Sequence, residues 1–323
     1  MHLVYADRRG GGFVMTRYLL FRIGTALIVI VGVASTVFFL IHLIPGDPVD
    51  VMLGESASAG DRAQLRQALQ LDLPIAQQWI GFLRGLVHLD WGHSLYDRQA
   101  VASLLAARAP ATLQLTLAAL SVAVTLGIPL GIVAAVRRGT LWDRLATGFS
   151  LLGVSIPNFW LGPLLVLLFS IALGWLPVSG RDAPGAWVLP AVTLGSGMAA
   201  ILARMVRSSL LDVLHEDFLR TARAKGLHPV RILLRHALPN ALLPVLTLIG
   251  LQLGALLGGA VITETLFNWP GIGLLTIESI QRRDYPLVQG CVLLISCSYV
   301  IVNLLTDLAY AWIDPRVQLG GHG

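Results

Sequence analysis

Charged residues are scarce in this sequence. Only 13% of its 323 residues are charged, whereas 55% are hydrophobic, and the mean hydropathy is +0.74. A soluble domain carries roughly a quarter charged residues. The deficit argues against a soluble domain and predicts an integral membrane protein.

Lysine is almost absent as well. Lys225 is the only lysine, and its context, Ala224-Lys225-Gly226, is not the Gly-Lys-Ser/Thr of a phosphate-binding P-loop. The chain itself is therefore not expected to bind ATP. The net charge of +5 comes from arginine, and in a membrane protein such an excess indicates topology rather than nucleic-acid binding.

The cysteines and histidines do not form a pattern typical of a disulfide, a metal site or a catalytic site. The two cysteines, Cys291 and Cys297, stand six residues apart in one apolar run, on different faces of a helix, so no disulfide is expected. An HExxH motif is missing, and Ser196 with His236 makes a poor hydrolytic pair. We expect no metal, no cofactor and no catalytic activity in this chain.

Six long apolar runs are the dominant positive feature. We predict transmembrane helices at 23–44, 111–136, 146–174, 187–203, 240–263 and 287–306, each of a length comparable to the ~20 residues that cross a bilayer. Only the first run holds an Asp, Glu, Lys, Arg or His residue, His42 near its end. Ion-coupled carriers generally need such residues at membrane depth, which disfavours a secondary carrier. Backbone carbonyls can bind Na⁺, so that alternative stays open.

The loops between the runs predict the topology. Arginines concentrate before the first run, in 137–145 and in 204–236, which places these segments and both termini in the cytoplasm. The N-terminal tail (1–22) starts at Met1 or, alternatively, at Met15. A C-terminal tail (313–323) follows the last run.

The 45–109 segment has ordinary polarity. It holds seven acidic residues and five arginines, which marks a non-cytoplasmic loop. Short amphipathic helices are expected around 61–70 and 75–88. A lid, a docking surface and a plain spacer all remain possible for this segment.

The most patterned loop is a basic elbow, residues 204–239. The sequence predicts a helix over 212–225, with Gly226 in the left-handed position that ends a helix and Pro229 at the first position of the next. We interpret Ala222, Ala224 and Gly226 as a low ridge that fits the groove of a partner protein. The alternative is an ordinary positive-inside loop.

Gly254 and Gly258 form a small-xxx-small pair that lets helices approach closely. The partner helix belongs either to this chain or to a second subunit.

At the elbow the sequence resembles the peptide-importing (DppB/OppB-like) permeases of ABC transporters. Their cytoplasmic EAA-type loop corresponds to Arg220, Thr221, Ala222, Arg223, Ala224, Lys225 and Gly226, followed by His236 to Asn240, which includes Pro239. Arg220 replaces the glutamate of the general motif, as is common in the peptide subgroup. Other matches run along the chain: Leu43–Pro48, Pro110–Leu113, Ser155–Trp160, Gly174–Pro177, Glu264–Gly273 and Arg283–Pro286.

The resemblance implies an all-α integral membrane protein with the type I ABC importer permease fold and a permease core over 110–312. It implies a bacterial inner-membrane complex with a second, DppC/OppC-like permease, two ATPase subunits or one fused ATPase, and an extracytoplasmic peptide-binding protein. The chain would contact membrane lipid and no nucleic acid. ATP and Mg would bind the ATPase partners, and the elbow would carry the coupling.

The resemblance leaves the cargo open among dipeptides, longer peptides, glutathione and nickel complexes. The runner-up function is a secondary carrier or channel that works without an ATPase.

Overall fold

The computed structural model describes residues 11–42, 49, 53, 58–68 and 71–313. These residues are helical or irregular, with one isolated bridge between His93 and Ala100. The motif at Pro45–Pro48, the residues at Met1 and the tail from 314 onward lie outside the described residues.

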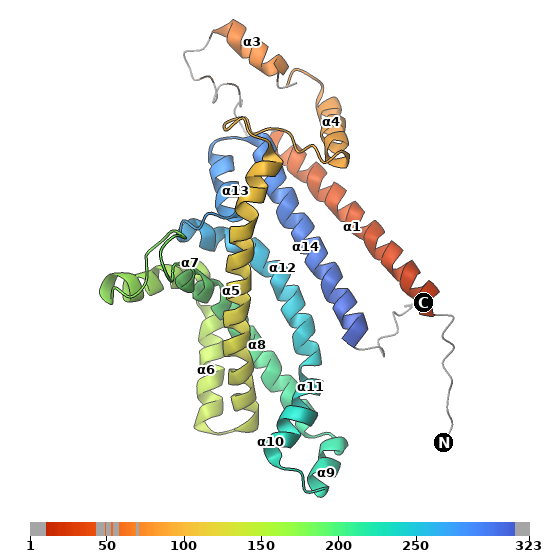
Figure 1. Cartoon of the computed structure of the whole chain (residues 1–323), viewed down its shortest axis with the longest axis vertical. Coiled ribbons are helices and arrows are strands. Elements are labelled where there is room, and N and C mark those ends of the chain that lie inside the picture. Colours follow the sequence, from red (N-terminus) through yellow and green to blue (C-terminus); the bar gives the residue numbers. More distant parts are fainter. Residues whose placement is uncertain (1–10, 43–48, 50–52, 54–57, 69–70, 314–323) are drawn as a thin grey trace.

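Five long helices build the molecule (Figure 1). Among the described residues, four helices contain a stretch long and apolar enough to cross a membrane alone: α1, α5, α8 and α14. Two bent helix pairs raise the number of candidate spans to six if each pair counts as one span. The expected all-α membrane fold is therefore confirmed. The long helices are α1 (Gly11–His42), α5 (Val101–Val136), α8 (Val188–Leu214), α12 (Leu243–Leu266) and α14 (Tyr285–Ile313).

The range 146–174, predicted as one span, contains a sharp bend. It holds most of α6 (Leu141–Ser155), then α7 (Asn158–Leu165) and the π-helix η1 (Val166–Ala172), and the two arms are bent by 107°. The bend falls at Ile156, which is extended at φ −88°, ψ 115°. Pro157 explains this conformation, because a proline disfavours the helical region for the residue before it.

Proline does not always end a helix here. α5 begins at Val101, ten residues before the predicted span, and Pro110 and Pro129 lie inside it. Membrane helices tolerate such prolines because neighbouring groups satisfy the freed carbonyls.

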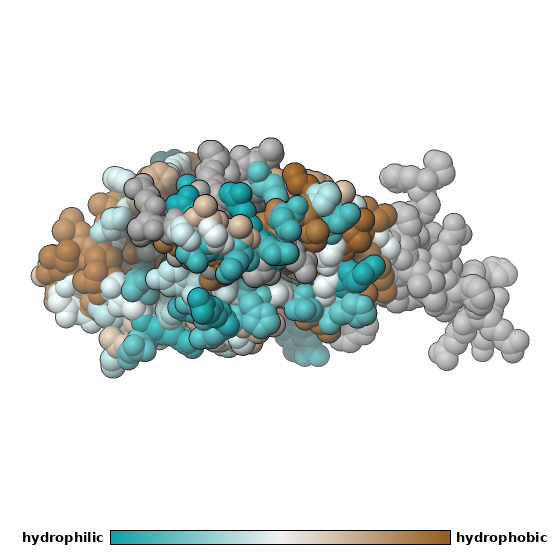
Figure 2. All heavy atoms as spheres, turned by 90° about the horizontal axis from the view of Figure 1, so that it is seen from above, coloured by the Kyte–Doolittle hydropathy of each residue, from teal (hydrophilic) through white to brown (hydrophobic). Residues whose placement is uncertain are grey.

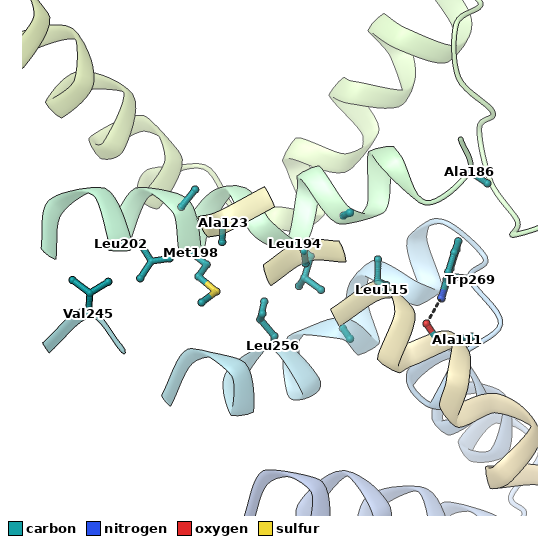
Figure 3. Packing of buried hydrophobic residues seen from close by; sticks show 14 of the residues in the cluster. Ala111, Leu115, Ala123, Ala186, Leu194, Met198, Leu202, Val245, Leu256 and Trp269 are labelled. Atoms are coloured by element: carbon teal, nitrogen blue, oxygen red, sulfur yellow. Dashed lines mark hydrogen bonds between the residues drawn. The ribbon is translucent and has the colours of Figure 1, made fainter. Parts of the chain in front are cut away.

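The core lies where α5 packs along α8, the most extensive helix pair. Glycine permits this contact: a Cβ on Gly127 would lie 2.7 Å from the Ala199 carbonyl oxygen, and one on Gly131 would lie 2.6 Å from that of Ala203. Figure 3 shows Leu194, Met198 and Leu202 of α8 facing side chains from α5 and α12 in this core.

The paired glycines of α12 contact different surroundings. A Cβ on Gly254 would lie 2.8 Å from the Tyr299 ring of α14, whereas nothing lies within 4 Å of Gly258. Gly254 therefore serves packing within this chain, and the Gly258 position is left open.

The two ends of the molecule differ. α13 (Ile272–Gln281), α3 (Ala59–Ala68) and α4 (Ile75–Val87) gather at the upper end, and α3 and α4 are the two short helices expected in the 45–109 segment (Figure 1). Seen from above, hydrophilic side chains gather in the middle of the view and hydrophobic ones at its margins (Figure 2). The left margin is where the α7–η1 arm projects, and that arm exposes Phe159, Trp160 and Ile171.

Candidate functional site

The elbow lies at the lower end of the molecule (Figure 1). Its first short helix, α9 (Asp217–Ala224), ends before Gly226, as the sequence predicts. Gly226, two residues after the end of α9, has φ +76°. Its N–H donates to the Arg223 carbonyl at 2.9 Å, and the Leu227 N–H donates to that of Ala222 at 3.4 Å. These two bonds are the Schellman pattern, which needs a left-handed residue and so favours glycine. Pro229 begins α10 (Pro229–Ile232), also as predicted.

The helix expected over 212–225 is in fact broken. α8 runs on to Leu214, and α9 starts only at Asp217, because Glu216 is extended at φ −68°, ψ 145°. Arg223 Nη2 donates to the Leu214 carbonyl at 3.2 Å, so a side chain of α9 satisfies the exposed end of α8. The elbow helix is thus a separate element tied directly to the end of a long helix.

Burial divides the predicted ridge. Ala222 is only 8% exposed and packs with Leu219, whereas Ala224, Lys225 and Gly226 are exposed. The interpretation of Ala222 as part of a free ridge is therefore wrong, because helical periodicity turns it toward the molecule. The exposed face of α9 consists instead of Asp217, Arg220, Thr221 and Ala224, with the exposed side chains of Phe218 and Arg223 on its two flanks.

The second half of the elbow is one irregular helical run. α10 continues through the π-helix η2 (Leu233–Ala237) into α11 (Leu238–Ala241). His236 is half-buried in η2, and Pro239 is exposed in α11. The Asn240 amide donates to the His236 carbonyl at 2.7 Å, which helps stabilise the irregular turn.

A small apolar core fixes the elbow to the long helices. Leu219 and Ala222 of α9 belong to one buried cluster with Ile232, Ala237, Leu210 of α8 and Ala135 of α5. Ser209 Oγ adds a hydrogen bond of 2.8 Å to the Ala241 carbonyl. The elbow core therefore places α9 in direct contact with α8 and with the end of α5.

An ion pair extends this connection to α6. Arg207 of α8 donates from Nε to Asp143 Oδ1 at 2.8 Å and from Nη2 to Oδ2 at 3.1 Å. Asp143 is buried, and the Gly139 N–H also donates to its carboxylate at 2.9 Å. The bidentate geometry orients both side chains, and the pair links α6 to α8.

A buried carboxylate organises the opposite end. Glu264, in the last turn of α12, is fully buried. Its Oε2 accepts hydrogen bonds from the N–H groups of Gly273 (2.7 Å) and Leu274 (3.1 Å), and its Oε1 accepts one from Thr112 Oγ1 (2.7 Å). We call these four residues the Glu264 clamp. It caps the start of α13 and joins α5, α12 and α13.

The clamp explains why glycine flanks the start of α13. A Cβ on Gly271 would meet the Glu264 carboxylate. Next to it, Trp269 Nε1 donates to the Ala111 carbonyl at 2.8 Å, a bond that Figure 3 shows. The Glu264–Gly273 and Pro110–Leu113 motifs are thus two halves of one contact.

Asp284 holds the end of the 45–109 segment. It is 1% exposed, and its carboxylate accepts hydrogen bonds from Ser94 Oγ, the Leu95 N–H (3.1 Å) and the Tyr96 N–H (3.4 Å). We call these four residues the Asp284 latch. It fastens the turn before α5 onto the junction of α13 and α14.

The sequence reasoning missed Asp143, Arg207, Glu264 and Asp284 as organising residues. The only signal was their place beside motifs or at the ends of apolar runs. The part of the chain that the structure describes holds no group of three or more His, Cys, Asp or Glu side chains suited to a metal ion.

Comparison with known proteins agrees with this architecture. Residues 127–319 match the family "Binding-protein-dependent transport system inner membrane component", and residues 15–116 match the N-terminal model of such components. Solved chains of the MetNI methionine ABC transporter, inward facing, share the fold at 21% identity and a TM-score of 0.54, covering 66% of this chain and 97% of that one. An amino acid ABC transporter gives a TM-score of 0.51 at 16% identity, covering 67% and 95%.

Relatives of known name are closer in sequence. The dipeptide transport system permease protein DppB of Escherichia coli K12 is 42% identical, covering 94% of this chain and 99% of the relative. The di/tripeptide permease DppB of Pseudomonas aeruginosa is 43% identical, and the glutathione permease GsiC of Salmonella typhimurium is 42% identical, each with the same coverage.

The helical core, with α9 carried at one end of α8, defines a type I ABC importer permease. The chain belongs to the family of binding-protein-dependent transport system inner membrane components. It is a multi-pass inner-membrane protein and the permease subunit of an ATP-driven importer.

Proposed function

We propose that this permease imports di- or oligopeptides and that its elbow, residues 204–239, receives the motion of a separate ATPase. A second, homologous permease would complete the translocation pathway, and an extracytoplasmic binding protein would deliver the peptide. ATP and Mg would bind two ATPase subunits or one fused ATPase, since this chain has no P-loop. Both termini would lie in the cytoplasm.

The peptide assignment rests on the relatives. Two of them are named for dipeptides or di- and tripeptides, and a third for glutathione, itself a small peptide. The transported substrate can be identified by measuring the uptake of different peptides by the complex with its binding protein. Glutathione and nickel complexes are tested as the alternative substrates.

The coupling assignment rests on one observation about the elbow. α9 exposes a short face with small side chains at Thr221 and Ala224, while its other face is part of the core that includes α8 and α5. A partner can approach the backbone closely at such a face, and the arginines around it suit acidic or carbonyl groups. A push on α9 then has a rigid route into the membrane helices.

Gly226→Asp tests the coupling. An L-residue at φ +76° costs roughly 1–2 kcal/mol, and the new carboxylate stands among basic side chains. We expect normal insertion with loss of ATPase docking or of ATP-driven uptake, measured on the purified complex in proteoliposomes. Gly174→Asp is the matched control, because Gly174 has φ +64° and open space but lies far from the elbow.

Wild-type uptake by an assembled Gly226→Asp complex contradicts the coupling role. Uptake by this chain alone, driven by an ion gradient, establishes the secondary-carrier alternative instead.

A further inference from the structure

The helix α4 of the 45–109 segment leans against α1. Trp79 Nε1 donates to Ser35 Oγ at 3.1 Å, and the rings of Phe82 and Phe38 stack with centroids 5.6 Å apart. His42 Nε2 lies 3.2 Å from Gln78 Oε1. α4 therefore runs beside the last turns of α1 (Figure 1).

These turns lie at the end of a helix that is long and apolar enough to cross a membrane. The candidate span of α1 runs from Arg22 to Leu40 and exposes apolar side chains along its length, Phe39 and Leu40 among them. Ser35 stands five residues before the end of that span, which is about 7.5 Å along a helix axis. Interfacial helices lie about 5–10 Å into the boundary between headgroups and acyl chains.

The composition of α4 fits that position. At 100° per residue its apolar side chains form one continuous arc, and its polar side chains form the other. Only part of the apolar arc touches α1: Ile80 remains 52% exposed and Val87 81% exposed. The apolar arc holds Ile75, Ala76, Trp79, Ile80, Phe82, Leu83, Leu86 and Val87, and the polar arc holds Gln77, Gln78 and Arg84.

We propose that α4 is an interfacial membrane helix, whose Ile80 and Val87 insert into the lipid leaflet at the His42 end of α1. Ile80 and Val87 are exposed on a helix that packs against α1, and Phe39 and Leu40 of α1 are exposed as well, so one lipid leaflet can solvate both helices. Gln77 and Arg84 face the headgroups and water. This placement depends neither on the cargo nor on the ATPase.

The placement changes what the 45–109 segment can do. α4 is held at the membrane surface, and the Asp284 latch fastens residues 94–96 to the junction of α13 and α14. Two separate attachments leave this part of the segment little freedom to swing. It is a fixed platform beside the membrane, in contrast to a mobile lid.

Spin-label accessibility tests the proposal on the assembled complex in nanodiscs of phosphatidylethanolamine and phosphatidylglycerol. Labels are placed by Ile80→Cys and Val87→Cys, with Gln77→Cys and Arg84→Cys as matched controls on the same helix. The background carries Cys291→Ala and Cys297→Ala, and each variant is first checked for uptake. Oxygen concentrates in hydrocarbon, whereas the nickel complex of ethylenediamine diacetic acid stays in water.

The ratio of oxygen to nickel accessibility is expected to be several-fold higher at positions 80 and 87 than at 77 and 84. Equally low ratios at all four positions overturn the proposal because they place the whole helix in water, and equally high ratios overturn it because they place the whole helix inside the hydrocarbon. Low accessibility to both reagents at 80 and 87 also overturns it, because a protein partner then covers the strip. Position 80 is compared with position 77, and position 87 with position 84. Each pair is an independent comparison, so one pair remains if a variant of the other pair fails to assemble.

Discussion

Ala222 and Ala224 stand two residues apart on α9, and burial separates their roles. Ala222 packs into the elbow core with Leu219, whereas Ala224 lies on the exposed face. In a single sequence both look like small residues of one motif. The packing of Leu219 and Ala222 against Leu210 and Ile232 shows which alanine points inward.

Tryptophan substitution separates the two alanines. Ala222→Trp overpacks the elbow core and is expected to lower stability by about 1–3 kcal/mol or more. Ala224→Trp is expected to leave the melting temperature unchanged and to weaken ATPase binding. Thermal unfolding and co-purification of the ATPase measure the two effects. Equal melting temperatures for the two variants contradict the assigned burial.

Glu264 joins three helices at the end of the molecule opposite the elbow. Its carboxylate is the acceptor for Thr112 and for two backbone N–H groups at the start of α13. Glu264→Leu removes all three acceptor contacts, and each buried donor left without a partner costs about 1–3 kcal/mol. Glu264→Gln keeps one acceptor oxygen and the side-chain size.

We therefore expect the melting temperature of the complex to fall in the order wild type, Glu264→Gln, Glu264→Leu. The melting temperature of Thr112→Val, which removes one hydrogen-bond donor of the clamp, is expected to lie between those of the wild type and Glu264→Leu. A Leu variant as stable as the wild type shows that the clamp is not needed.

At the scale of elements, the helix ends show which features a sequence reveals. Gly226 and Pro229 act on their own backbone, so their positions were predicted from the sequence alone. The bend at Ile156 is also local, because Pro157 causes it, but the apolar run hid it. Hydropathy reports composition, and it does not report where an apolar run changes direction.

The contacts between elements could not be predicted in this way. Asp143 and Arg207 are 64 residues apart, Thr112 and Glu264 are 152 apart, and Ser94 and Asp284 are 190 apart. The periodicity of apolar residues indicates which residues share one face of a helix, but it does not indicate which helices pack against each other. These charged residues therefore looked like ordinary ends of loops.

The Asp143–Arg207 pair joins two elements, and a double-mutant cycle measures its contribution. Arg207→Gln leaves a buried carboxylate without its partner, and Asp143→Asn removes the charge that the guanidinium binds. We expect the double variant to lose less stability than the two single losses together, with a coupling energy of about 0.5–3 kcal/mol. Unfolding half-lives of the purified complex provide the measurement. Additive losses rule out a direct energetic link between α6 and α8.

At the scale of the whole molecule, composition gave the class and the motifs gave the family. Scarce charge predicted a membrane protein, and the matches from Pro110 to Pro286 predicted the permease family that the comparisons confirm. The fold follows a simple plan: α5 and α8 form a close-packed centre, the elbow is fixed to one end of it, and the Glu264 clamp and Asp284 latch hold the other. The elbow core holds side chains of α9, α8 and α5, and it is the contact through which we propose that the motion of the ATPase passes.

The most direct test of this account is a photo-crosslink from the elbow in the native complex. A benzophenone amino acid replaces Thr221 on the exposed face of α9, and the control position is Tyr96, which is 64% exposed at the opposite end. The account predicts an adduct with the ATPase from position 221 and none from position 96. The absence of an ATPase adduct at 221, in a complex that retains ATP-driven uptake, would contradict the claim that ATP energy enters through the elbow.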